Sequence, residues 1–242
     1  GSALSAAEAE RERTNAIATA HLRDEATMLA GVVSDALAQL DEVRLPLHIL
    51  LESRFGELNE NQEELLRDAR TSADAMDVAL RRLGQVAEAD RGAMAAQLEL
   101  VQINDVLRSV LPLARSASKR RGARLETAFE PGLPRVTADR ARLAEALALL
   151  TTEAARATGP QQPLVISTTR DGSAAVIRIA PVARDANPSF EYTKESSGVD
   201  AQPVARAGGS ATTASILASR LIAVQGGAIS IDGDVLVLRI GQ

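Results

Sequence analysis

A long stretch of helical periodicity, interrupted by one proline, constrains the fold more than any other feature of this sequence. Between Ala6 and Arg54 the only glycine is Gly31 and the only proline is Pro46. Apolar residues recur along the stretch at helical spacing, which predicts one helix with an apolar stripe. The stripe consists of Leu29, Val33, Leu37, Leu40, Leu47 and Leu51. At about 1.5 Å per residue this helix would be roughly 70 Å long, which is too long for one compact globule. A proline costs about 3 kcal/mol inside a helix, so Pro46 requires an explanation.

A second helix is predicted after a short break. Gly56 suits the end of the first helix and Asn59 suits the N-cap of the next, which runs from Glu60 to about Ala89. The apolar face of this second helix contains Leu65, Leu66, Ala69, Ser72, Ala73, Met76, Leu80, Leu83 and Val86. Two helices joined by a short loop form an antiparallel hairpin. A hairpin alone does not bury stripes this wide, so we expect two copies to pair as a homodimeric four-helix bundle.

The remainder of the chain has the composition of an α/β domain. After Asp90-Arg91-Gly92 the predicted order is strand, helix, strand, helix, two strands, a long loop, helix and two strands. Asn104 and Asp139 are predicted to cap the first two of these helices, and Asp171-Gly172 is typical of a hairpin turn. The last helix is expected over 211–225, ending at Gly226-Gly227. This order predicts a mixed sheet with helices on one face.

Composition excludes several classes of function. A net charge of −5, without a basic stripe that carries aromatic residues, indicates no nucleic-acid partner. The absence of Cys excludes disulfides and thiolate metal sites, and it fits a cytoplasmic protein. No apolar run reaches the length of about 18 residues that spans a membrane, so we expect no direct membrane span. Gly1-Ser2 is typical of an expression remnant, and we expect domains upstream of this chain.

The run from Leu40 to Leu47, Leu-Asp-Glu-Val-Arg-Leu-Pro-Leu, resembles the phospho-acceptor box of sensor histidine kinases, His-Glu-Leu-Arg-x-Pro-Leu. Glu42, Arg44 and Pro46 match that box, whereas Asp41 stands where the family has its histidine. Two later features also match the family. One is a run that contains Leu133, Pro134, Val136, Asp139, Arg142 and Leu143, and the other is Gly226-Gly227 after the last helix. The resemblance covers nearly all of residues 30–240.

The sequence pattern and the resemblance together predict three parts. Residues 1–28 would form a charged, Ala-rich and coiled-coil-like lead-in, and residues 29–92 a helical hairpin for dimerisation. Residues 93–242 would form an α/β sandwich like the ATP-binding domain of histidine kinases. The fold class we predict is therefore α+β, a long helical hairpin forming a dimeric four-helix bundle followed by this sandwich.

The nucleotide motifs of the family are degenerate here. Counting from Arg142-Leu143, Glu153 stands where the family has an Asn that helps to hold Mg²⁺, and Leu149 stands at the preceding conserved Asn. A carboxylate suits Mg²⁺ chemically but adds negative charge beside a triphosphate. No metal ligand is therefore predicted.

Two glycine-rich motifs are lost as well. Pro181 and Ala183 occupy the positions of the adenine-contacting Asp and the first Gly, and Asp185 occupies that of the next Gly. The phosphate-binding loop falls on 210–215, where Ser210 and Thr212 replace glycines. Ser or Thr hydroxyls could bind an anion at this helix start, although Ser210 is better explained as an N-cap.

These losses predict a catalytically inactive, dimeric signalling scaffold or regulator without a cofactor. Its partner would be a response regulator or a partner kinase, docked around Asp41, Glu42, Arg44 and Pro46. One alternative is a histidine phosphotransferase, with His48 as an alternative phospho-acceptor about two turns after Asp41. Another is a different ligand in the former nucleotide cleft, under a loop over 182–209 that contains Phe190 and Tyr192. The basic run Lys119-Arg120-Arg121 is interpreted as a solvated helix end.

Overall fold

The computed structural model describes residues 2–52, 56–160, 162–181 and 212–241. The chain divides into two compact units, Gly1–Met94 and Ala95–Gln242. We call them the helical hairpin and the α/β unit and describe each by itself.

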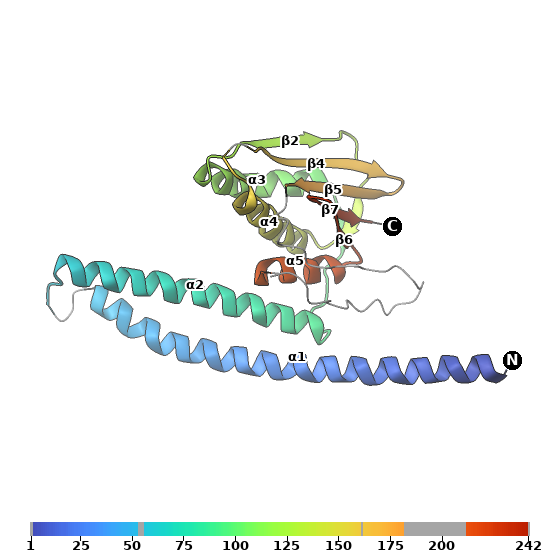
Figure 1. Cartoon of the computed structure of the whole chain (residues 1–242), viewed down its shortest axis with the longest axis horizontal. Coiled ribbons are helices and arrows are strands. Elements are labelled where there is room, and N and C mark those ends of the chain that lie inside the picture. Colours follow the sequence, from blue (N-terminus) through green and yellow to red (C-terminus); the bar gives the residue numbers. More distant parts are fainter. Residues whose placement is uncertain (1, 53–55, 161, 182–211, 242) are drawn as a thin grey trace. The chain divides into compact units, whose positions relative to one another are not determined.

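The helical hairpin consists of α1 (Ser2–Leu51) and α2 (Glu60–Asp90), as the apolar periodicity predicts. The two helices run antiparallel beside each other over most of α2 (Figure 1). Val33 and Leu40 of α1 and Ala73 of α2 are buried between them. Pro46 lies inside α1 without ending it, in the last turns, where the helix curves (Figure 1). A proline ring pushes the preceding turn aside, which explains such a curve.

A capping box starts α2. The side chain of Asn59 accepts a hydrogen bond from the Gln62 amide at 2.9 Å, and the Asn59 amide donates to Gln62 Oε1 at 3.0 Å. This confirms Asn59 as the N-cap. Gly56 has a φ of 122°, in the region that favours glycine, but α1 already ends at Leu51. The sequence indicated that Gly56 follows directly after the first helix, and this prediction is wrong.

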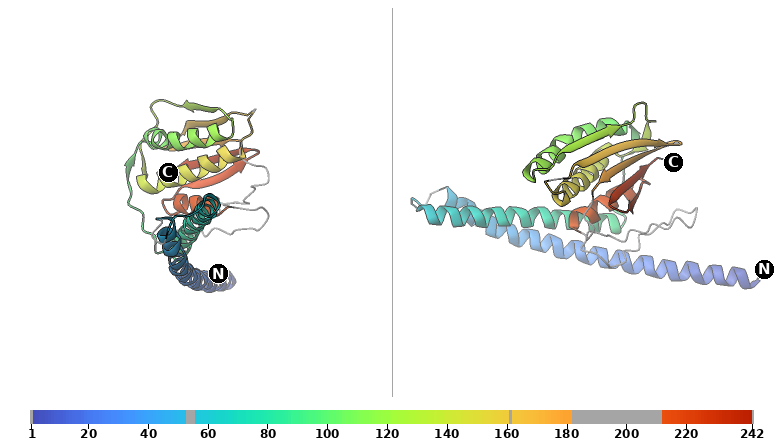
Figure 2. Two further views of the ribbon diagram at one scale, coloured as in Figure 1. Left: turned by 90° about the vertical axis from the view of Figure 1, so that its left-hand side faces the viewer. Right: turned by 45° about the horizontal axis from the view of Figure 1, so that its top comes forward.

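The α/β unit contains three helices and seven strands among its described residues. They are β1 (Glu99–Val101), α3 (Ile103–Arg120), β2 (Leu125–Phe129), β3 (Val136–Ala138), α4 (Arg140–Ala157), β4 (Leu164–Asp171), β5 (Ala174–Ala180), α5 (Thr213–Ala223), β6 (Ala228–Asp232) and β7 (Val235–Ile240). The main sheet has the order β2-β4-β5-β7-β6, with only β2 and β4 parallel. The three helices lie side by side along one side of this sheet (Figures 1 and 2). The predicted mixed sandwich is confirmed.

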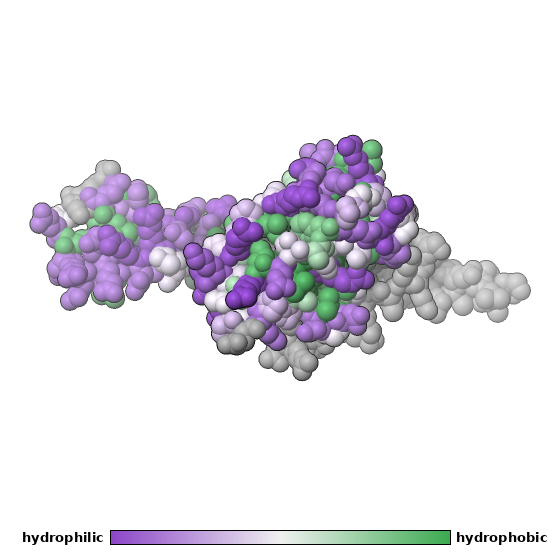
Figure 3. All heavy atoms as spheres, turned by 90° about the horizontal axis from the view of Figure 1, so that it is seen from above, coloured by the Kyte–Doolittle hydropathy of each residue, from purple (hydrophilic) through white to green (hydrophobic). Residues whose placement is uncertain are grey.

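The core of the α/β unit lies between the sheet and these helices. Ile166 of β4 lies opposite Ile179 of β5, and Ile177 lies opposite Leu238 of β7, all of them buried. Alternation along the strands gives this pattern, because successive side chains point to opposite faces. On the surface, hydrophobic residues gather among hydrophilic ones on the side drawn in Figure 3.

Three sequence predictions for this unit are corrected. Gln102 rather than Asn104 is the N-cap of α3, and Asn104 lies inside the helix. Its side chain instead donates from Nδ2 to the Glu130 carbonyl at 2.9 Å and accepts at Oδ1 from the Thr168 hydroxyl at 3.0 Å, because a buried polar side chain needs partners. Thr212 rather than Ser210 is the N-cap of α5. The short strand β3, which pairs with β1, was missed.

Candidate functional site

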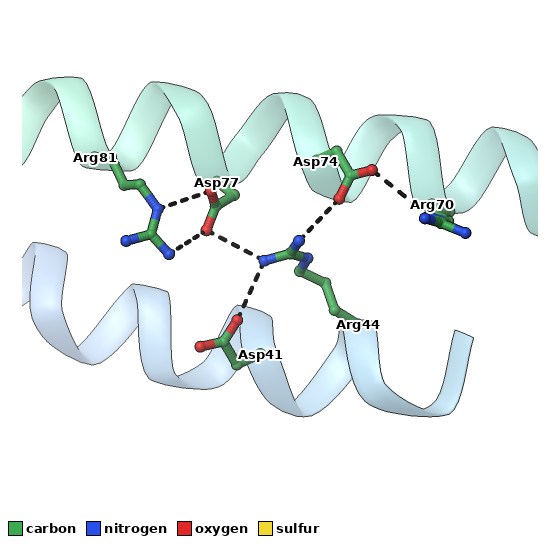
Figure 4. Close-up of polar contacts among 6 residues, drawn as sticks. All are labelled: Asp41, Arg44, Arg70, Asp74, Asp77 and Arg81. Atoms are coloured by element: carbon green, nitrogen blue, oxygen red, sulfur yellow. Dashed lines mark hydrogen bonds and ion pairs between the residues drawn. The ribbon is translucent and has the colours of Figure 1, made fainter. Parts of the chain in front are cut away.

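Six charged side chains meet where α1 and α2 face each other (Figure 4). Asp41 and Arg44 come from α1, and the others come from α2; we call these residues the charged cluster. Its α2 members are Arg70, Asp74, Asp77 and Arg81. Three arginines balance three aspartates, so the cluster carries no net charge.

Arg44 is the centre of the charged cluster. Its Nη1 lies 3.4 Å from Asp41 Oδ1 and 3.4 Å from Asp77 Oδ1, and its Nη2 lies 3.1 Å from Asp74 Oδ1. The guanidinium fork can engage several carboxylates at once because its donors lie in one plane. Arg44, the arginine of the acceptor box, is therefore bound by the carboxylates of its own hairpin.

Asp77 is the least exposed member, with 14% of its side chain accessible. Arg81 donates to it twice, from Nε at 2.8 Å and from Nη2 at 3.0 Å. These hydrogen bonds, together with the charges of Arg81 and Arg44, hold the pKa of Asp77 below its ordinary value despite partial desolvation. The same pair raises the pKa of Arg81.

Asp41 and Glu42 are open to solvent, as is Pro46. The side chain of Asp41 is 65% exposed and has Arg44 as its ion-pair partner. Asp41, Glu42 and Pro46 are thus accessible, but the rotation of about 100° per residue places Glu42 and Pro46 on a different face of α1 from Arg44. Sequence analysis missed Asp74 and Asp77, which only the antiparallel register of the helices places beside Arg44.

His48 is also on the surface of α1. Its side chain is 58% exposed, and its Nε2 lies 3.1 Å from Glu52 Oε1, four residues further along. Its helical phase differs from that of Asp41 by only about 20°, so both point to the same side of the hairpin.

An apolar surface lies on the opposite side of the hairpin. Its exposed members are Val32 at 60%, Val43 at 55%, Leu50 at 37%, Leu65 at 69% and Met76 at 56%; we call it the apolar side. Leu65 and Met76 were expected in the apolar face of α2, and they are not covered within one chain. Successive residues of a helix are rotated by about 100° around its axis. On both helices this rotation places these exposed apolar residues on one side of the contact between α1 and α2, and the charged cluster on the other side.

In the α/β unit, the degenerate nucleotide positions are engaged in local contacts. Glu153 Oε1 lies 2.7 Å from Arg156 Nη1, one turn along α4. Thr212 accepts a hydrogen bond from the Ser215 amide at 3.2 Å as the N-cap of α5. Pro181 follows β5 and has no amide to donate.

The other predicted positions of this pocket lie outside the described residues. They are Ala183, Asp185, Phe190, Tyr192 and Ser210. Across the ranges that the structure describes, no group of three or more His, Asp or Glu side chains could hold a metal ion. No helix in those ranges has the length and apolar character to cross a membrane.

Asp139, from the second family-like run, has a structural role. It caps α4 by accepting from the Arg142 amide at 3.0 Å, and it also accepts from the Gln97 amide at 2.8 Å. Burial would raise the pKa of Asp139, but these backbone hydrogen bonds and the charge of Arg142 hold it below its usual range. The Asp139 amide in turn donates to Gln225 Oε1 at 3.0 Å. Asp139 therefore connects the start of α4 to the segment before β1 and to the end of α5 by hydrogen bonds.

Comparisons with known proteins agree with this fold. No family model matches the chain. The cell-division control histidine kinase PdhS of Brucella ovis is 26% identical over 168 residues, 66% of this chain and 16% of that protein. PdhS of Brucella anthropi is 25% identical over 177 residues, 69% of this chain and again 16% of that protein. The chain thus spans about 16% of the length of these curated relatives.

Two solved structures share its architecture. Full-length ShkA, solved in complex with AMPPNP, superposes with a TM-score of 0.62 at 22% identity over 85% of this chain and 45% of that one. The Acinetobacter baumannii histidine kinase AdeS gives 0.57 at 14% identity over 85% of this chain and 96% of that one. The chain therefore has histidine kinases as homologues, and its long helices and mixed sheet form the fold of their core.

Proposed function

We propose that this homologue of the histidine kinases is a dimeric, catalytically inactive signalling protein of a two-component system. It would act as a scaffold or regulator in the cytoplasm. The charged cluster would dock a response regulator or a partner kinase.

One observation carries the proposal. The acceptor position holds Asp41, whose carboxylate pairs with Arg44, and Arg44 is bound in turn by Asp74 and Asp77. A carboxylate that is paired with a guanidinium is a weakened nucleophile, so this arrangement favours a structural role for the box. The contacts of Glu153 and Thr212 support the same conclusion for the nucleotide positions, because both side chains serve their own helices.

The apolar side supports the dimer. Val43 and Met76 are more than half exposed in one chain, and large apolar side chains in one patch mark an interface. Burying this patch against a second copy would complete a four-helix bundle over residues 29–92, with residues 1–28 as a coiled-coil lead-in. The sandwich of residues 93–242 would remain attached to each hairpin.

Docking is supported by what stays accessible in such a dimer. The charged cluster lies on the side opposite to the apolar side, so pairing of two copies leaves it uncovered. Leu45 and Val78, exposed at 61% and 46%, have helical phases that place them on the same side as Asp41. Accessible polar groups beside apolar side chains that can be buried are the composition of a transient protein interface.

Calorimetry with ATP·Mg²⁺ tests the inactivity. We expect no binding heat from this protein, whereas an intact histidine-kinase core in the same buffer gives a saturable signal. Binding with micromolar affinity would refute the proposal that the nucleotide site is lost.

A second candidate function is phosphotransfer through His48. The observation in its favour is the Glu52 carboxylate at 3.1 Å from His48 Nε2, on the side that carries Asp41. Incubation with a phosphorylated response regulator would then label the protein, and His48→Ala would abolish the label. An unlabelled wild-type protein would refute phosphotransfer through His48.

A further inference from the structure

The outer face of α3 contains an open hollow of about 550 Å³. Its lining residues are Arg108, Leu111, Pro112, Arg115, Ser116 and Lys119, and we call it the α3 hollow. These residues recur at helical spacing, on the side of α3 away from buried Leu107 and Val110. The hollow belongs to the α/β unit and contains no residue of the charged cluster or of the former nucleotide motifs.

Pro112 gives the hollow an unusual polar group. It lies inside α3 and has no amide hydrogen, so the carbonyl of Arg108 lacks the donor that a regular helix provides. The proline ring also pushes against that preceding turn. A ligand with a backbone N–H could therefore bond to a carbonyl at the edge of the hollow.

The hollow is also strongly basic in a chain whose net charge is −5. Arg108 forms an ion pair with Asp105, with Nη1 2.9 Å from Oδ1. Within the part of the chain that the structure describes, no carboxylate lies at ion-pair distance from Arg115 or Lys119. Both side chains are exposed, so their charges are available to a ligand.

We propose that the α3 hollow binds an acidic peptide segment of a partner protein. Its carboxylates would pair with Arg115 and Lys119, and an apolar side chain would pack on Leu111 and Pro112. One of its backbone amides would donate to the Arg108 carbonyl. Among the residues that the structure describes, no aromatic side chain lines the hollow for a base to stack on, which favours a peptide over a single-stranded nucleic acid.

Fluorescence anisotropy with a labelled peptide of alternating Glu and Leu tests the proposal on the full chain. We expect saturable binding that weakens as salt is added, because screening removes the charge attraction. The double reversal Arg115→Glu, Lys119→Glu should weaken binding by about tenfold or more, because both contacts become repulsive. Pro112→Ala keeps every charge but restores an amide to the helix, and it should weaken binding as well.

The matched control is Arg135→Glu, Arg140→Glu, which makes the same change of charge at exposed residues of the same unit. It should leave peptide binding near the wild-type level, and circular dichroism should show all variants folded. Equal losses in both double variants would mean a general charge effect and overturn the proposal. So would equal binding of a Lys-Leu peptide or tighter binding of a single-stranded DNA of equal charge. None of these outcomes depends on whether the charged cluster docks a partner.

Discussion

Arg44 of α1 and Asp77 of α2 are joined by an ion pair, with Arg44 Nη1 3.4 Å from Asp77 Oδ1. This contact connects the acceptor box to the second helix of the hairpin. The contact holds Arg44 in place against α2. The charged cluster therefore depends on both helices of the hairpin.

Asp77→Asn should lower the melting temperature more than Asp74→Asn does. Asp77 is 14% exposed and accepts two hydrogen bonds from Arg81 and one from Arg44, whereas Asp74 is 48% exposed and has ion pairs of 3.1 Å with Arg44 and 3.9 Å with Arg70. Thermal unfolding followed by circular dichroism at pH 7 provides the comparison. Equal shifts in the two variants would show that Asp77 contributes no more to stability than Asp74 does.

Asp41→His should not restore autophosphorylation. The variant recovers the family's acceptor residue, but the nucleotide motifs still lack the residues that the family has there. Incubation with radiolabelled ATP·Mg²⁺ should leave the variant unlabelled while an intact histidine kinase is labelled in parallel. A labelled variant would mean that the α/β unit still binds and uses ATP.

Met76→Glu should weaken the proposed dimer. It places a charge in the middle of the apolar side, and burying an unpaired charge is costly, so the dimer should dissociate at about tenfold higher concentration or more. Val78→Glu is the matched control, since this residue of α2 points to the other side. Sedimentation equilibrium measures both variants, and the same shift in each would contradict the assignment of the apolar side.

Asp139→Asn should destabilise the α/β unit by about 2 kcal/mol at pH 7, because the Asn side chain can still cap α4 but loses the charge and the second oxygen, which accepts from the Gln97 amide. The folded-state pKa of Asp139 is lowered, so its contribution is complete above the unfolded value of about 3.9. The contribution is lost as the pH falls through the folded pKa. Urea unfolding should therefore show a difference from wild type that shrinks below about pH 4.

The control for Asp139 is Asp105→Asn, at an exposed carboxylate whose partner Arg108 lies at 2.9 Å. Its effect should stay below about 1 kcal/mol at any pH. A pH-independent loss in Asp139→Asn would show that packing, not the charge, explains the effect.

Gly227→Ala should destabilise the same unit by about 1–3 kcal/mol. A Cβ at this position would lie 2.7 Å from Ile222 Cγ2 and 3.3 Å from the Arg239 carbonyl, so the turn after α5 would have to move. Gly159→Ala serves as the control, because nothing lies within 4 Å of its added Cβ. That variant should be neutral or slightly more stable in urea unfolding, and a large loss there would point to a general intolerance of added methyl groups.

The order of helices and strands follows largely from local sequence. Apolar spacing predicted α1 and α2, and Asn59 and Asp139 are the caps that their residue types indicate, because these interactions involve residues close in sequence. The box around Asp41 and the later family-like run were likewise recognisable, and so was the kinase-like fold that they imply.

Local sequence did not reveal which polar residues would meet across the fold. Asn104 resembles a helix cap in sequence, yet it bonds to Glu130 and Thr168, which come from distant segments of the chain. Asp77 is one of many acids on a charged helix until the antiparallel register brings it to Arg44. Such pairings depend on how separate elements pack, since the free energy of a buried polar group is set by its neighbours in space rather than in sequence.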